Sequence, residues 1–81
     1  MKRYQVEFIF GTGQYRIVNL INKTAMEGSL LGEIVNEQNC EQLFADVCAA
    51  MCMAGIAHDG NEIECITFPE GSTRTFSGGV A

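Results

Sequence analysis

Residues 39–55 read NCEQLFADVCAAMCMAG, and this stretch decides the fold of the chain. Its larger apolar side chains and its cysteines recur at steps of three and four: Cys40, Leu43, Phe44, Val47, Cys48, Met51 and Cys52. That spacing places them on one face of an α-helix, as a stripe wide enough to cover a β-sheet. The stretch therefore predicts a helix from Asn39 to Gly55 that packs on a sheet.

Both ends of this helix carry recognisable signals. Asn39 is an expected N-cap, and Gln42 can complete a capping box with it. Gly55 can adopt the left-handed conformation that ends a helix, with Ile56 packing back on Met51. The outward face is small and smooth, which indicates either a solvated face of high helix propensity or a close contact with a second helix or a second copy of the chain.

The residues before the helix alternate as strands do. Residues 3–10 place Tyr4, Val6, Phe8 and Phe10 on one face, which predicts a half-buried strand. The three-residue connection 11–13 contains two glycines and predicts a hairpin. A second strand is expected over 14–22, followed by a turn.

The region 24–38 is ambiguous. We expect a third strand from near Ser29 to Val35. A short helix is the alternative, because Thr24 and Glu27 resemble a capping box. The last strand is expected at Glu62–Phe68, parallel to the first or the third strand.

The predicted fold class is thus α+β, in the order β-β-β-α-β. A small antiparallel meander of three strands carries one main helix on one face, and a fourth strand follows the helix. The expected core consists of Tyr4, Val6, Phe8, Phe10, Ile17, Leu43, Phe44, Val47, Met51 and Ile63.

The 81 residues are enough for one domain. We expect a single α+β domain at 1–70 and a flexible tail rich in Gly, Ser and Thr at 71–81, within which Thr73–Phe76 could add a short edge strand. No apolar run is long enough to span a bilayer, and the first residues lack the apolar core of a signal peptide. A cytoplasmic protein is therefore expected.

The four cysteines are expected to be reduced and buried, because free cysteine behaves as a small hydrophobe. The alternative is a metal site formed by Cys48, Cys52, Cys65 and His58. The sequence contains no Cys-x-x-Cys pair, so we predict no metal, no disulfide and no cofactor.

Charge is the feature that stands out most. The chain has five basic and ten acidic residues, for a net charge of −5. Nine carboxylates and no lysine or arginine occur between Thr24 and Thr73: Glu27, Glu33, Glu37, Glu41, Asp46, Asp59, Glu62, Glu64 and Glu70. Four of the basic residues, Lys2, Arg3, Arg16 and Lys23, lie in the first two predicted strands or directly beside them, so we expect a protein that is basic near the hairpin and acidic over the helix and later loops. An acidic surface repels nucleic acid and attracts basic partners, although it also serves solubility alone.

An enzyme is not expected, because a single histidine in a turn permits no catalytic triad by spacing. We predict a small non-catalytic interaction protein that docks on a basic, nucleic-acid-binding surface of another protein, without binding nucleic acid or a membrane itself. The expected contact residues are Glu33, Glu37, Glu41 and Asp46, around the start and outward face of the helix. The alternative is a homodimeric structural domain, or a domain that binds a small ligand.

In size, charge and order of elements, the chain resembles several small phage-encoded inhibitors such as anti-CRISPR proteins. These are often acidic domains of a sheet and a helix that block nucleic-acid sites on host proteins. The resemblance implies a phage or mobile-element inhibitor, but no motif transfers a functional residue to this chain.

Overall fold

The elements follow one another in the predicted order. The computed structural model describes residues 2–71, in which the strands are β1 (Tyr4–Ile9), β2 (Gln14–Asn19), β3 (Thr24–Ser29) and β4 (Ile63–Phe68). The helix α1 (Cys40–Met53) lies between β3 and β4, and a short 3₁₀ turn, η1 (Gly60–Glu62), leads into β4. The predictions of a flexible tail at 71–81 and of a strand at Thr73–Phe76 fall almost entirely on residues 72–81, outside the described residues.

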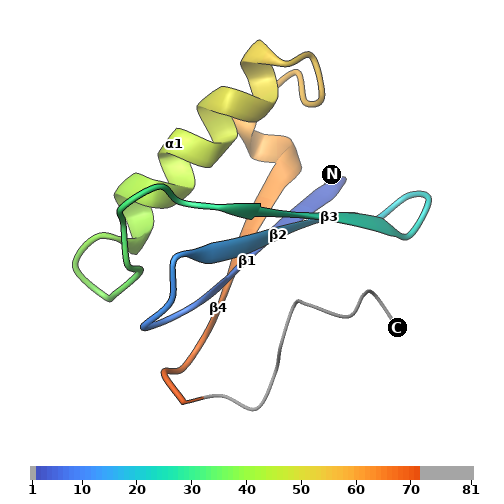
Figure 1. The fold of residues 1–81 in the computed structure, drawn as a ribbon. Coiled ribbons are helices and arrows are strands. Elements are labelled where there is room, and N and C mark those ends of the chain that lie inside the picture. Colours follow the sequence, from blue (N-terminus) through green and yellow to red (C-terminus); the bar gives the residue numbers. More distant parts are fainter. Residues whose placement is uncertain (1, 72–81) are drawn as a thin grey trace.

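The strands form one sheet in the order β3-β2-β1-β4 (Figure 1). β1 pairs antiparallel with β2 and parallel with β4, so that Val6 stands between Ile17 and Cys65. β2 pairs antiparallel with β3 at the edge. A parallel pair needs a crossover, and α1 lies within it. The predicted α+β fold is confirmed, and the strand parallel to β4 is β1.

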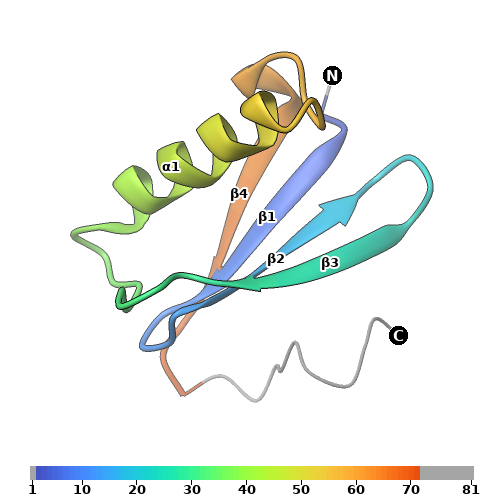
Figure 2. The same ribbon diagram turned by 45° about the horizontal axis from the view of Figure 1, so that its top comes forward.

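The helix covers only half of the sheet. Figure 2 shows α1 above β4 and β1, with β2 and β3 extending away from it. Strands are spaced about 4.8 Å apart and a helix with its side chains is about 10–12 Å across, so one helix spans about two strands. Within residues 2–71, no other element covers the inner face of β2 and β3.

The core lies between α1 and the inner face of the sheet. Its buried members are Val6, Phe8, Ile17, Val35, Leu43, Val47, Met51, Ala57 and Ile63. Seven of the ten residues expected in the core are among them. The other three, Tyr4, Phe10 and Phe44, pack against this core but are only partly buried.

The helix ends as predicted but begins differently. Gly55 has φ +76°, its N–H donates to the carbonyl of Cys52 at 3.1 Å, and the N–H of Ile56 donates to that of Met51 at 2.9 Å. These bonds form a Schellman motif. The expected capping box is wrong: the side chain of Asn39 makes no capping bond, and Gln42 donates to Asp46 at 3.0 Å instead.

The third strand lies earlier than predicted. A turn over 20–23, with Lys23 at φ 61°, returns the chain at once, so that β3 starts at Thr24 instead of near Ser29. Neither the strand to Val35 nor the alternative helix forms in this part of the structure. Val35 lies in a loop, but its side chain is buried. A buried apolar residue at this position gave the sequence the appearance of a strand.

A buried ion pair lies on the sheet face opposite α1, and the sequence reading missed it. Glu7 is 3% exposed, and it stands directly across from Arg16, another buried residue, in the β1–β2 register. Arg16 Nε–H donates to Glu7 Oε1 at 2.8 Å, and Gln5 Nε2–H donates to Glu7 Oε2 at 2.7 Å. One of the five basic residues is therefore held inside the protein and contributes little to the surface charge.

No helix in residues 2–71 has the length and apolarity that a membrane span requires.

Candidate functional site

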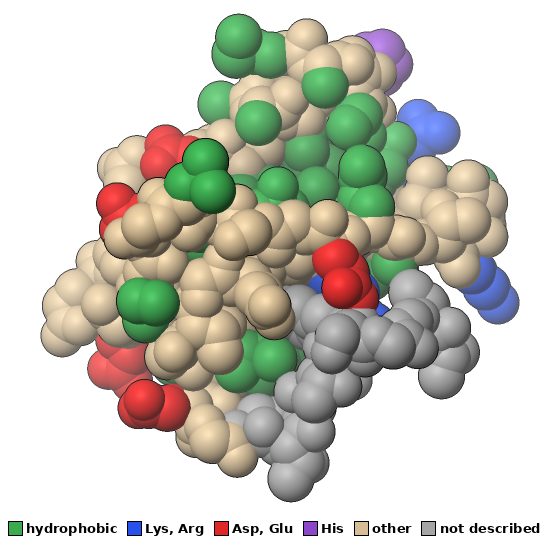
Figure 3. Space-filling model, viewed as in Figure 1, with side chains coloured by type: hydrophobic (Ala, Val, Ile, Leu, Met, Phe, Trp, Pro, Cys, Tyr) green, Lys and Arg blue, Asp and Glu red, His purple; other side chains and the backbone are tan. Residues whose placement is uncertain are grey.

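Carboxylates gather at one end of the molecule, and the basic side chains lie at the other end, where Arg3 is 3.6 Å from the carboxylate of Glu62. Figure 3 shows most of the acidic side chains of this face on the side that holds the start of α1 and the loop before it, acidic atoms also near the middle of the face, and basic side chains at the opposite side. The N–H of Leu20 donates to the carbonyl of Arg3 at 2.8 Å, which places the β2–β3 turn with Lys23 beside the start of β1. The basic groups thus lie at the end of the β1–β2 hairpin away from its turn.

The loop 30–39 carries two of the predicted contact residues and is held in place by backbone bonds. Val35 is buried, its N–H donates to the carbonyl of Thr12 at 2.9 Å, and its carbonyl accepts from Gly11 N–H at 2.9 Å. Asn36 and Asn39 bond each other's backbone: Asn39 Oδ1 accepts from Asn36 N–H at 2.8 Å, and Asn36 Oδ1 accepts from Asn39 N–H at 3.0 Å. These contacts fix the backbone of the segment that contains Glu33 and Glu37.

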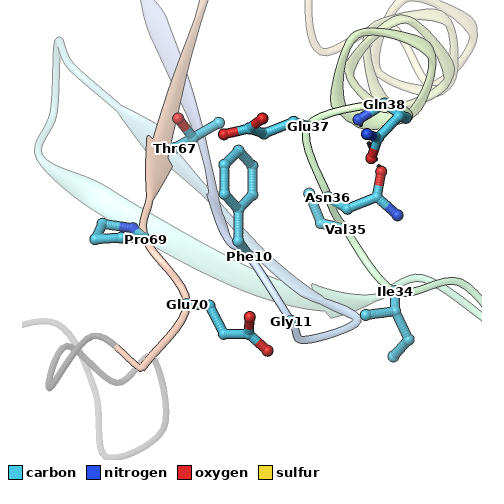
Figure 4. A pocket seen from close by; sticks show the side chains of 10 residues that line it. All are labelled: Phe10, Gly11, Ile34, Val35, Asn36, Glu37, Gln38, Thr67, Pro69 and Glu70. Carbon is cyan, nitrogen blue, oxygen red and sulfur yellow. Dashed lines mark hydrogen bonds between the residues drawn. The ribbon is translucent and has the colours of Figure 1, made fainter.

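Glu37 lines a hollow of about 680 Å³ where β1 and β4 end. The other lining residues are Phe10, Gly11, Ile34, Val35, Asn36, Gln38, Thr67, Pro69 and Glu70. In Figure 4 the carboxylate of Glu37 lies on one side of the Phe10 ring, near Thr67, and Glu70 lies across the hollow beside Gly11.

This hollow has the composition of a site for a cation. In the part of the chain that the structure describes, the two charged residues of its lining are both acidic, and Phe10 contributes an aromatic ring. Carboxylates accept charge-assisted hydrogen bonds from guanidinium and ammonium groups, and a ring face attracts the same cations. The arrangement can therefore receive an arginine or lysine side chain of another molecule.

The structure brings only part of the predicted site together. Glu33, Glu37, Glu41 and Asp46 are all exposed, as expected. Glu37, however, faces the hollow, whereas Asp46 lines a separate groove between α1 and β3. The predicted set is thus spread along one side of the molecule and does not form one cluster.

Glu70 is the residue of the hollow that the contact prediction omitted. It follows β4, and the N–H of Phe10 donates to the carbonyl of Phe68 at 3.0 Å, so the ends of β1 and β4 lie side by side. A parallel β1–β4 pair implies this neighbourhood, but the sequence reading left open whether β4 would pair with the first or the third strand.

Two other carboxylates between Thr24 and Thr73 support the fold. Asp59 and Glu62 form a capping box around η1. Backbone N–H groups of His58 and Asp59 donate to Glu62 Oε1 at 2.8 and 3.1 Å, and with Arg3 nearby they lower the pKa of Glu62. Fewer carboxylates are therefore available to a partner than the number in the sequence indicates.

The cysteines are free but less buried than expected. Cys40, Cys48 and Cys65 are partly buried, and Cys52 is exposed, because it lies at the edge of the helical stripe. Burial raises the pKa of Cys65 to about 11, with smaller contributions from Cys40 and Cys48. In the described part of the chain, no group of three or more His, Cys, Asp or Glu side chains is placed to hold a metal ion.

No protein-family model, no curated protein and no solved structure matches this chain.

Proposed function

We propose that this protein is a non-catalytic binder whose acidic side docks on a basic surface of another protein. The observation that carries this proposal is the hollow in which Glu37 and Glu70 stand around Phe10, with no basic residue among the residues 2–71 that line it. A partner arginine inserted there would meet a carboxylate on each side and a ring between them, which favours guanidinium over a smaller cation.

The remaining predicted contact residues extend this surface. Glu33 lies in the same loop as Glu37, whereas Glu41 and Asp46 lie on α1. All three are exposed and would face further cations of the partner. Basic surfaces of this kind commonly bind phosphates, so the partner we propose is a nucleic-acid-binding protein whose arginine and lysine sites the carboxylates would occupy. A phage or mobile-element inhibitor is the biological role that we propose with it.

Affinity capture from the native host, at low and at high salt, tests this proposal. The parent protein should retain a basic protein at low salt and release it at high salt, because attraction between opposite charges is screened. The double variant Glu37→Lys/Glu70→Lys should lose the captured protein. The matched control Glu27→Lys/Glu64→Lys changes the net charge equally, at exposed positions outside the hollow, and should keep it.

Equal capture by both double variants would show that the carboxylates of the hollow make no specific contact. Adding Glu41→Lys and Asp46→Lys to the first variant then tests the wider acidic surface. If this fourfold variant still captures the protein, the carboxylates of the acidic side serve only solubility.

A homodimer is the second candidate, and exposed apolar side chains favour it. Leu31 is 91% exposed and Met53 is 88% exposed. Small domains gain stability by association, and Ala45 and Ala49 leave the outward face of α1 smooth enough for close contact. Sedimentation velocity over a range of micromolar concentrations distinguishes the two candidates, since a monomer at every concentration rules out the dimer.

A further inference from the structure

A second hollow, the α1–β3 groove, lies over the half of the sheet that α1 leaves uncovered. It encloses about 440 Å³ and is lined mainly by apolar side chains. Tyr15 and Met26 form its floor, Ala50 and Ala54 its wall on α1, and Leu31 extends from the loop beyond β3. Figure 3 shows hydrophobic side chains gathered between α1 and β3.

The size of the uncovered area matches one helix. Two strands at a spacing of about 4.8 Å present about 10 Å of sheet, which is close to the width of an α-helix with its side chains. Ala50 and Ala54 are small, so a helix lying beside α1 could approach it closely. Met26 is 53% exposed at the floor, and a large apolar side chain above it would remove that surface from water.

Charge distinguishes between the helices that could occupy this groove. Among the described residues that line it, Asp46 is the charged one, and residues 24–71 contain no lysine or arginine. The α1 helix of a second copy would present Glu41, Ala45 and Ala49 on its outward face, which is acidic, and its large exposed apolar side chain, Met53, is the last residue of the helix. Such a helix would repel Asp46 and leave the groove unfilled.

We infer that the α1–β3 groove receives an amphipathic helix of a partner protein. Large apolar residues of that helix face Met26 and Leu31, and its lysine or arginine residues lie beside Asp46. This helix-in-groove mode packs one apolar helical face into a hydrophobic cleft. The basic character of the helix rests on the proposed function, whereas the apolar and geometric match does not.

The probe is a panel of synthetic helical peptides of 14 residues, the length of α1. Each carries Leu, Ile or Phe at positions i, i+3, i+4 and i+7, with Lys and Arg at the flanks of this stripe. Scrambled peptides of the same composition are the controls. Fluorescence anisotropy should show binding of members of the panel but not of the scrambled peptides, and the NMR methyl signal of Met26 should shift on binding.

A pair of matched substitutions on α1 locates the peptide. Ala50→Trp places a large ring in the groove and should weaken binding by about tenfold or more. Ala45→Trp makes the same change at an exposed position of α1 outside the groove and should leave binding unchanged. Asp46→Lys should weaken binding at low salt more than at high salt, because it reverses the charge that faces the peptide.

The inference is overturned if no member of the panel binds better than the scrambled peptides, or if Ala50→Trp and Ala45→Trp act alike. It is also overturned if the protein sediments as a dimer that Ala50→Trp dissociates, because the occupant is then a second copy. If Ala50→Trp strongly destabilises the isolated monomer, the groove is filled by the chain itself and the inference fails.

These results are independent of the test of the proposed function. Loss of capture by Glu37→Lys/Glu70→Lys without any peptide binding would keep the basic partner and reject the groove. Peptide binding with unchanged capture by that variant would keep the groove and reject the Glu37–Glu70 hollow as the contact.

Discussion

The two halves of the sheet consist of similar strands but differ in how deeply their inner faces are buried. In the β4–β1 half, Val6, Phe8 and Ile63 lie under α1 and are buried. In the β2–β3 half, burial ends at Ile17, and Met26 on the next strand is largely exposed. The comparison shows that a four-stranded sheet with one helix has core for about two strands, so the other two are left with an apolar face available for binding.

The largest effects are expected where the two halves are compared directly. Phe8 is 0% exposed, so Phe8→Ala should lower the free energy of unfolding by about 3–5 kcal/mol. Met26→Ala should lower it by less than about 1 kcal/mol, because that side chain is already half in water. Urea unfolding followed by circular dichroism measures both. Similar losses would mean that the two halves contribute equally to stability.

A second prediction concerns the opposite face of the same central strand. Glu7→Ala removes the buried carboxylate that lies 2.7 Å from Arg16 Nη2 and should cost about 3–5 kcal/mol. The double variant Glu7→Leu/Arg16→Leu removes both charges and should cost clearly less than the single change. A double variant as unstable as Glu7→Ala would show that packing, and not the ion pair, is what matters at this position.

The third prediction tests how firmly the loop 30–39 is joined to the sheet. A Cβ at Gly13 would lie 2.6 Å from the carbonyl oxygen of Glu33, and backbone cannot easily give way. Gly13→Ala should therefore cost about 1–3 kcal/mol. Gly60→Ala is the matched control, since a Cβ there meets nothing within 4 Å and the change should stay within about 0.5 kcal/mol. Equal stability of the two variants would show that the loop is free to shift.

A smaller effect is expected from pH at the entry to β4. The pKa of Glu62 is lower when folded than when unfolded, because the N–H groups of His58 and Asp59 stabilise the carboxylate. Its contribution to stability is complete above the ordinary glutamate pKa of about 4.3 and is lost as the pH falls through the lower folded value. Glu62→Gln should therefore make stability fall less steeply on acidification. Urea midpoints at several pH values below neutrality measure this, and an unchanged slope would contradict it.

The smallest effect is expected in thiol reactivity, which tests whether α1 shields the β4–β1 half of the sheet. Cys52 is exposed and should react quickly with a thiol reagent in the native protein. Cys65 should react slowly at neutral pH, because its pKa is raised to about 11 and the thiolate is the reactive form. Denaturant should make all four cysteines reactive. Fast native labelling of Cys65, mapped by mass spectrometry, would show that α1 does not shield β4.

Local patterns in the sequence predicted most of the fold. The helical stripe, the strand within residues 3–10 and Gly55 each depend on neighbours in the chain, and the structure confirms them. The prediction that this strand is half-buried was wrong, because Glu7 and Ile9 on its other face are buried as well. The third strand was predicted too late in the sequence because Val35 is apolar. This residue lies in a loop that folds back and buries its side chain in the core. The Glu7–Arg16 pair was not predicted, because the alternation of residues 3–10 indicates a half-buried strand with Glu7 on its outer face. Glu70 joins the hollow through a parallel strand pairing, which sequence spacing alone left open.

The parallel pairing of β1 with β4 also determines when this protein can complete its fold. β1 and β2 are joined by a short turn and can pair early. The other edge of β1 can pair only after Ile63–Phe68 has been synthesised. Contacts of such high sequence separation form late, because a long loop must close before they contribute. During synthesis the meander can assemble early. The layer between α1 and the central strand closes only after β4 has left the ribosome, so a nascent chain stalled before residue 63 holds a helix and a hairpin without a finished core.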